Sequence, residues 1–228
     1  MILKVAVLLA SLASAEAQTA FKNLDFEQAS PVPASNPQLP GAVTAASAFP
    51  DWTIYCGTVQ QTQVLQNGET FGQAIADIFG PTSPPPILNV PGIIDGQYSA
   101  ALQGGAGQVP GVPVSASIEQ TGLVPAGDQS IEFKAWGSPI EVSLNGNTLP
   151  LVTLETTANY TLYGASISAY AGETATLDFI CPPNGGAVTL TELDDITFST
   201  SSAPEPSPAL LAALGGLIFA TLRRKMRR

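Results

Sequence analysis

The sequence predicts an all-β protein built as a two-sheet antiparallel sandwich. Of its 228 residues, 45% are hydrophobic and only 11% are charged, and 21 Gly and 20 Pro supply turn formers throughout. Thr, Val, Ile and Ser are frequent, which favours strands. Segments that alternate apolar and polar residues recur about every ten residues, a spacing typical of sandwiches rather than of sheets connected by helices.

The clearest strands are expected in the second half of the chain. Residues 129–136 alternate cleanly, so Ile131, Phe133 and Ala135 fall on one face. Residues 140–144 repeat the alternation and lead into Asn145-Gly146, a strong signal for a type I′ hairpin. Residues 69–79 fit either a short helix or a pair of strands. The remaining strands are expected at residues 21–27, 51–57, 94–102, 116–122, 159–167, 173–181 and 188–198.

Residues 1–17 have the pattern of a secretory signal peptide. Lys4 stands before an apolar run, and Ala13-Ser14-Ala15 supplies the small residues that signal peptidase prefers. The sequence therefore predicts an exported protein, in which a helical signal segment precedes a single domain over residues 18–200.

Residues 201–228 have the pattern of a membrane tail. Pro204-Glu205-Pro206 is followed by 14 uncharged residues, 209–222, and then by a basic end that starts with Arg223 and Arg224. As a helix, the uncharged run would span about 21 Å. That is short of a hydrocarbon core of about 30 Å, a difference that snorkelling arginines and local bilayer thinning would accommodate. The basic end is expected on the cytoplasmic side.

The order of these three parts resembles the PEP-CTERM sorting signal of Gram-negative bacteria. The resemblance implies that a membrane protease of the exosortase type cuts the chain near Pro204-Glu205-Pro206. It also implies that the C-terminal helix holds the protein in the inner membrane before processing, and that the protein then reaches the outer surface or the extracellular matrix. The alternative is a simple tail anchor.

The predicted domain is strongly acidic. Between Gln18 and Ala203 there are 16 acidic residues and only two basic ones, Lys22 and Lys134, which gives a formal charge of −14. Such a surface repels phosphate backbones, so no nucleic-acid partner is expected, while divalent cations and neutral glycans are compatible with it. The chain has no His, which excludes His-based triads and His metal sites.

The two cysteines are too few for a thiolate metal cluster within one chain. Because export leads to an oxidising compartment, a disulfide between Cys56 and Cys181 is predicted. The alternative is two buried free thiols on different strands.

Three short stretches of the domain resemble galactose-binding-like jelly rolls, which include many carbohydrate-binding modules. These are residues 23–27, Trp52 and residues 193–198. Residues 117–122 and 159–164 also look like exported PEP-CTERM domains. The resemblance implies a two-sheet jelly roll in which the first and last strands are neighbours.

The same resemblance implies a structural Ca²⁺ where the first and last strands meet. Its carboxylate ligands would be Glu27 and Asp195, with backbone carbonyls completing the shell. Asp25 and Asp194 would lie nearby. The alternative is that these acids are solvated turn carboxylates, and no other cofactor is expected.

Trp136 is the expected surface aromatic for stacking on a sugar ring, because it ends a strand just before Gly137-Ser138-Pro139. The alternative is a packing role, which is also what we expect for Trp52. The chain has no Gly-x-Ser-x-Gly motif and no phosphate-binding Gly-rich loop with a Lys. We therefore predict a non-catalytic surface or matrix protein, structural or glycan-binding. The alternative is a secreted glycoside hydrolase that uses a carboxylate pair.

Overall fold

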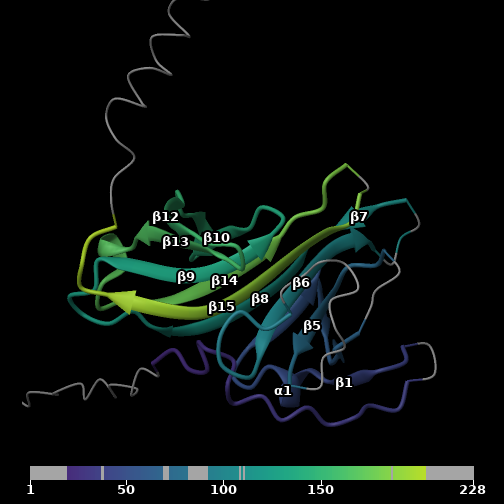
Figure 1. Ribbon diagram of the computed structural model, residues 1–228. Coiled ribbons are helices and arrows are strands. Elements are labelled where there is room, and N and C mark those ends of the chain that lie inside the picture. The colour runs from purple at the N-terminus through teal and green to yellow at the C-terminus, as the bar shows by residue number, and fades with distance from the viewer. Residues whose placement is uncertain are drawn as a thin grey trace, which may run out of the picture.

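The predicted β-sandwich is confirmed. The computed structural model describes residues 20–36, 39–68, 72–81, 92–107, 109, 111–185 and 187–203. Within these ranges the chain forms two sheets that pack face to face (Figure 1). The described helices are one α-helix, α1 (Ala45–Ala48), and one 3₁₀ turn, η1 (Ser168–Tyr170).

The larger sheet has nine strands, in the order β1-β4-β5-β6-β15-β9-β13-β12, with β7 paired to β6. All pairs are antiparallel except β4 with β5. The strands are β1 (Ala42–Thr44), β4 (Gln63–Gln66), β5 (Ile75–Phe79), β6 (Ser99–Ala106), β7 (Pro113–Val114), β9 (Ser130–Gly137), β12 (Val152–Thr156), β13 (Thr161–Ser166) and β15 (Thr189–Ser199).

The smaller sheet has six strands, in the order β11-β10-β14-β8-β2-β3, and is antiparallel throughout. Its strands are β2 (Thr53–Cys56), β3 (Val59–Gln61), β8 (Ala116–Leu123), β10 (Glu141–Leu144), β11 (Asn147–Thr148) and β14 (Thr174–Cys181). The predicted hairpin after residue 144 is present. Asn145 and Gly146 have φ of 51° and 74°, and Leu144 pairs with Asn147.

The strand order is that of a jelly roll. From β6 onward the chain passes repeatedly between the sheets, which places β6-β15-β9-β13 in one layer and β8-β14-β10-β11 in the other. The earlier strands extend this core at one side: β2 and β3 lie beyond β8, while β1, β4 and β5 lie beyond β6. In Figure 1 the N-terminal strand β1 accordingly lies at the edge of the sandwich, with α1 beside it.

Aromatic rings join the two sheets in the core. Phe133 of β9 lies 5.1 Å from Phe179 of β14, edge to face, and Phe179 also contacts Trp52 at 6.3 Å. Phe26 packs on Trp52 at 5.9 Å. Each such pair contributes about 0.5–1.5 kcal/mol beyond its buried area. The core role expected for Trp52 is confirmed, since only 6% of its surface is exposed.

Residues 21–27 form turns rather than the predicted first strand. Asn23 and Phe26 have left-handed φ angles of 48° and 57°, and the side-chain oxygen of Asn23 accepts the N–H of Gln28 (3.0 Å). Asn tolerates this conformation and offers the backbone a local partner, which competes with a strand ladder. The segment nevertheless runs beside β15, because the N–H of Ile196 donates to its backbone (3.0 Å).

Residues 94–98 are also a loop, so the predicted strand 94–102 begins only at Ser99. The ambiguous stretch 69–79 contains strand β5 from Ile75, and residues 69–71 lie outside the described ranges. The other predicted strands match observed ones to within two residues at each end.

The predicted signal peptide and all but residues 201–203 of the predicted tail lie outside the described residues. This applies to the signal peptide over residues 1–17 and to the sorting residues Pro204, Glu205, Pro206, Arg223 and Arg224. In the part of the chain that is described, no helix has the length and apolar character needed to cross a membrane.

Candidate functional site

The outer face of the large sheet carries Lys134 and Trp136. Alternation along β9 sends Phe133 and Ala135 into the core, so the side chains between them point the other way. Across the ladders, Lys134 lies opposite Asp194 of β15, and Trp136 lies opposite Glu192.

A cavity of about 330 Å³ opens where β9 ends and β13 begins. Trp136 and Tyr160 both line it, and both side chains are half-buried. Thr161 pairs with Ala135, so one further step along the antiparallel ladder sets Tyr160 opposite Trp136. The full lining is Ala135, Trp136, Gly137, Ser138, Thr157, Ala158, Tyr160, Thr161 and Tyr163. Aromatic walls with a few hydroxyl groups are typical of small-molecule and sugar sites.

A polar turn holds the backbone of Tyr160. The Thr157 hydroxyl donates to the carbonyl of Tyr160 (3.0 Å) and accepts its N–H (3.0 Å), while the N–H of Thr157 donates to the same carbonyl (2.9 Å). This turn connects β12 to β13 and fixes the point from which the Tyr160 ring projects.

Lys134 stands beside the cavity between two carboxylates. Its ammonium group pairs with Asp95 and with Asp195 (2.9 Å), and it lies 5.3 Å from the centre of the Tyr160 ring. Only 16% of the Lys134 side chain is exposed, against 56% for Asp95 and 41% for Asp195. Burial disfavours the ammonium, but the two carboxylates outweigh this effect and raise the pKa of Lys134. The same contact lowers the pKa of Asp95.

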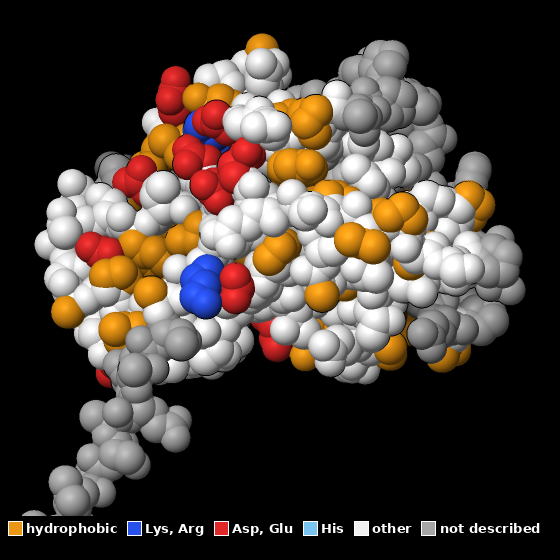
Figure 2. All heavy atoms as spheres, turned by 90° about the horizontal axis from the view of Figure 1, so that it is seen from below, with side chains coloured by type: hydrophobic (Ala, Val, Ile, Leu, Met, Phe, Trp, Pro, Cys, Tyr) orange, Lys and Arg blue, Asp and Glu red, His pale blue; other side chains and the backbone are white. Residues whose placement is uncertain are grey.

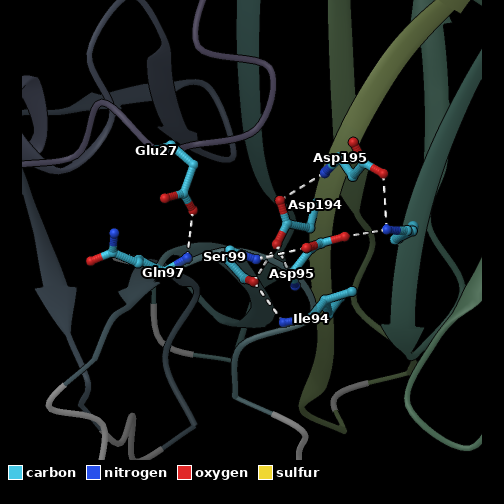
Figure 3. A network of polar contacts seen from close by, with 9 residues as sticks. Glu27, Ile94, Asp95, Gln97, Ser99, Asp194 and Asp195 are labelled. Carbon is cyan, nitrogen blue, oxygen red and sulfur yellow. Dashed lines mark hydrogen bonds and ion pairs between the residues drawn. The ribbon is translucent and has the colours of Figure 1, made fainter.

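Buried carboxylates on β15 hold the loop over residues 92–98, which we call the acid-bound loop. Figure 3 shows the part of it that contacts Asp194 and Glu27. Asp194 accepts the N–H of Asp95 (3.1 Å), the hydroxyl of Ser99 (2.5 Å) and the N–H of Asp195 (2.7 Å). Glu192 accepts the N–H of Gly92 (3.2 Å) through one oxygen, while its other oxygen is buried without a hydrogen-bond partner.

Glu27 holds the same loop from the N-terminal side. Its Oε1 accepts the N–H groups of Gln97 (2.7 Å) and Tyr98 (2.9 Å). The close approach requires glycine at position 96, where φ is 59° and a Cβ would lie 2.3 Å from Glu27 Oε1. Three carboxylates from two separate segments therefore fix one loop through its backbone.

Burial raises the pKa of three carboxyl groups of the large sheet to about 7. They are Asp194 and Glu192, each about 1% exposed or less, and Asp77 on β5, which is 5% exposed. In each case loss of hydration is the largest cause, and hydrogen bonds from backbone or hydroxyl groups oppose it.

The structure gives the two predicted calcium ligands different partners. Glu27 binds backbone N–H groups of the acid-bound loop, whereas Asp195 pairs with Lys134. Nowhere in the described ranges do three acidic or thiol side chains gather so that they could hold a metal ion. Asp195 shares the ammonium group of Lys134 with Asp95.

The predicted disulfide is wrong, because both cysteines are free thiols. Cys56 and Cys181 pair with the same residue, Ala116, from opposite sides of β8. Two strand spacings place their Cα atoms about 9–11 Å apart, beyond the limit of about 7 Å for a disulfide. Cys181 is instead in contact with the hydroxyl of Thr189 (3.4 Å), and Cys56 donates to the carbonyl of Ala74 (3.1 Å).

Sequence patterns identified Trp136 but missed the network beside it. Glu192 and Asp194 alternate with buried residues on β15, which predicts solvent exposure, yet the acid-bound loop covers them. No local pattern could have indicated this burial, because the covering loop lies about 100 residues earlier in the chain.

Comparisons with known proteins give structural similarity at low sequence identity and no family match. The sequence matches no protein-family model and no curated protein. Among solved structures, TmCBM61 in complex with beta-1,4-galactotriose is similar over 79% of this chain and 97% of its own, with 13% identity and a TM-score of 0.43. The enzymatically active domain of bacteriophage CBA120 tailspike protein 4 is similar over 66% of this chain and 19% of its own, with 14% identity and a TM-score of 0.35. Scores this low carry no argument about function.

Proposed function

We propose that this protein is an exported, non-catalytic β-sandwich protein that binds neutral glycan at the cavity between β9 and β13. The observation that carries the proposal is the pairing of Trp136 with Tyr160 on the walls of that cavity. Two aromatic side chains there offer apolar faces to a sugar ring, and the hydroxyl groups of Ser138 and Thr157 offer polar contacts.

The charge around the cavity favours neutral over acidic sugars. Asp95 and Asp195 are both partly exposed, and the single ammonium group of Lys134 is already shared between them. Acidic side chains gather on one part of the surface, with apolar side chains beside them, as Figure 2 shows. A uronic acid or sulfated polymer would meet repulsion at such a surface.

The buried carboxyls give no support to the rival hydrolase. Glu192 and Asp194 have the raised pKa that a general acid needs, but they are at most 1% exposed and hold a loop. A general acid must come within hydrogen-bond reach of the leaving oxygen.

The terminal sequences extend the proposal to the location of the protein. We propose that it is exported, is processed by an exosortase-type protease, and remains at the outer surface or in the extracellular matrix.

The test is polysaccharide binding by the full-length chain in mild detergent. Affinity electrophoresis through gels containing β-glucan, β-galactan, xylan, α-glucan or alginate would report retention, and a reducing-end assay would report hydrolysis. We expect retention by at least one neutral polymer, none by alginate, and no new reducing ends. Trp136→Ala should weaken retention about tenfold or more, which corresponds to about 1.4 kcal/mol.

Tyr55→Ala is the matched control, because Tyr55 is an aromatic residue on β2 of the small sheet, whereas the cavity lies at β9 and β13 of the large sheet. It should leave retention unchanged. If no polymer of this panel retains the wild-type chain, the glycan proposal fails. New reducing ends that disappear in a carboxylate variant would instead make it a hydrolase.

A further inference from the structure

Lys134 does not line the cavity, but it contacts the ring of Tyr160, which does. Its ammonium group reaches Asp95 in the acid-bound loop, Asp195 on β15 and the face of the Tyr160 ring. The Lys134 side chain is mostly buried, whereas the two carboxylates are partly exposed. One residue therefore connects a loop, a strand and an aromatic wall.

Each partner of Lys134 is itself fixed in place. The N–H of Asp95 is held by the buried Asp194, and Asp195 sits at a break in the β9–β15 register with a left-handed φ of 48°. The Tyr160 ring projects from a turn whose backbone is bound by Thr157. The ammonium group is thus held at a defined point over the ring, where a cation is attracted to the negative π face.

We propose that Lys134 is a positioning residue for the glycan site, holding the Tyr160 ring against the cavity through a cation–π contact anchored by Asp95 and Asp195. The inference rests on the proposed function for its consequence in binding. Its structural content, the dependence of the Tyr160 ring on Lys134, holds independently of any ligand.

Removing the charge has two local effects. The Tyr160 ring loses the group above it, and the Asp95 and Asp195 carboxylates lose the cation that separates them. Repulsion would then push these carboxylates apart and loosen the rim beside the ring. Since sugar stacking depends on the ring orientation, affinity falls although no atom of Lys134 touches the sugar.

The experiment compares Lys134→Met, which keeps the length of the stem, with Lys134→Arg, which keeps the charge. We expect Lys134→Met to weaken retention about tenfold and Lys134→Arg to stay within about threefold of wild type. Lys22→Met is the matched control: Lys22 forms an exposed pair with Asp51 at 3.6 Å and should not affect retention. Urea unfolding confirms that each variant is folded.

A double-mutant cycle identifies the route of the effect. In a Tyr160→Leu background, Lys134→Met should cost less than about twofold, because the ring through which Lys134 acts is already absent. An equal loss in both backgrounds would overturn the proposal, since Lys134 would then act by a route other than the Tyr160 ring, through the sugar itself or through the Asp95 and Asp195 carboxylates.

The ring signals of Tyr160 in the NMR spectrum, assigned by their absence in Tyr160→Leu, provide a readout without glycan. They should shift in Lys134→Met and be restored in Lys134→Arg. Unchanged ring signals in Lys134→Met would refute the inference even if the glycan proposal succeeds. Shifted signals without any polysaccharide binding would refute the glycan proposal alone.

Discussion

Acidic residues on the outer faces of the two sheets have different surroundings. On the large sheet, Asp194 and Glu192 are covered by the acid-bound loop and accept hydrogen bonds from it. On the small sheet, Asp178 of β14 lies directly opposite Glu119 of β8, and both side chains are half-buried. The two lysines of the described chain are engaged elsewhere, with Asp51 and with the Asp95 and Asp195 pair.

This difference shows that the pKa of a carboxyl group can be raised in two different structural situations within one molecule. Burial raises the pKa of Asp194 to about 7 while three donors hold its oxygens, so the group is a structural anchor. Burial and the charge of Glu119 raise the pKa of Asp178 to about 6, and one of its oxygens has no partner. The first carboxyl stabilises the fold, whereas the second is tolerated by it.

The largest effect should come from Asp194→Ala. The change leaves the N–H of Asp95 and the hydroxyl of Ser99 without their acceptor beneath the loop. Unmade hydrogen bonds of buried groups cost about 1–3 kcal/mol each, so we expect the free energy of unfolding to fall by about 2–4 kcal/mol. Urea unfolding followed by Trp fluorescence measures it.

Ser99→Ala is the graded control for this prediction, because it removes one of the three donors to Asp194 together with the acceptor of the Ile94 N–H (2.8 Å), and it should cost about 1–2 kcal/mol. A loss below about 1 kcal/mol in Asp194→Ala would mean that the loop does not depend on the buried carboxyl.

A smaller effect is expected from pH. Folding raises the pKa of Asp77, Glu192 and Asp194 to about 7, so the folded protein binds these protons more tightly than the unfolded chain does. The stability that they contribute is fully present below the unfolded pKa of about 4 and is lost as the pH rises through about 7. The free energy of unfolding should therefore fall between pH 5 and pH 8, by at least the roughly 1.4 kcal/mol that one pKa unit at one group represents.

Urea midpoints at fixed salt, taken at several pH values, test this directly. Asp194→Ala should show a shallower decline, because one of the titrating groups is gone, while Glu173→Gln, at an exposed carboxylate, should follow wild type. Stability that rises with pH over this interval would show that these carboxyls are not buried as described.

The smallest effect should come from Asp178→Asn on the other sheet. The amide removes a like charge directly opposite Glu119, so the free energy of unfolding should stay unchanged or rise by less than about 1 kcal/mol. The same urea assay measures this change, with Glu119→Gln as the reciprocal variant. A loss above about 1 kcal/mol would reveal a further partner of Asp178 besides the Ser117 side chain, such as a bound cation, and would remove the contrast with Asp194.

Local patterns were enough to predict the sandwich and most of its strands. Period-two alternation identified the strand 129–136, and Asn145-Gly146 specified the hairpin that follows β10, because both depend on neighbouring residues only. The same logic placed Trp136 at a strand end facing outward. It failed for residues 21–27, where Asn23 binds the local backbone and a turn replaces the strand.

The sequence alone determined the sheet-forming segments, the acidic balance of the domain and an outward-facing Trp136. Only the tertiary structure decided that Cys56 and Cys181 stand on either side of Ala116, too far apart to join. It also decided that Lys134 meets Asp95 and Tyr160, and that the acids of β15 are covered by a loop about 100 residues earlier in the chain. The reason is physical: alternation records which face a residue takes, whereas strand order and loop cover bring together residues that no local pattern connects.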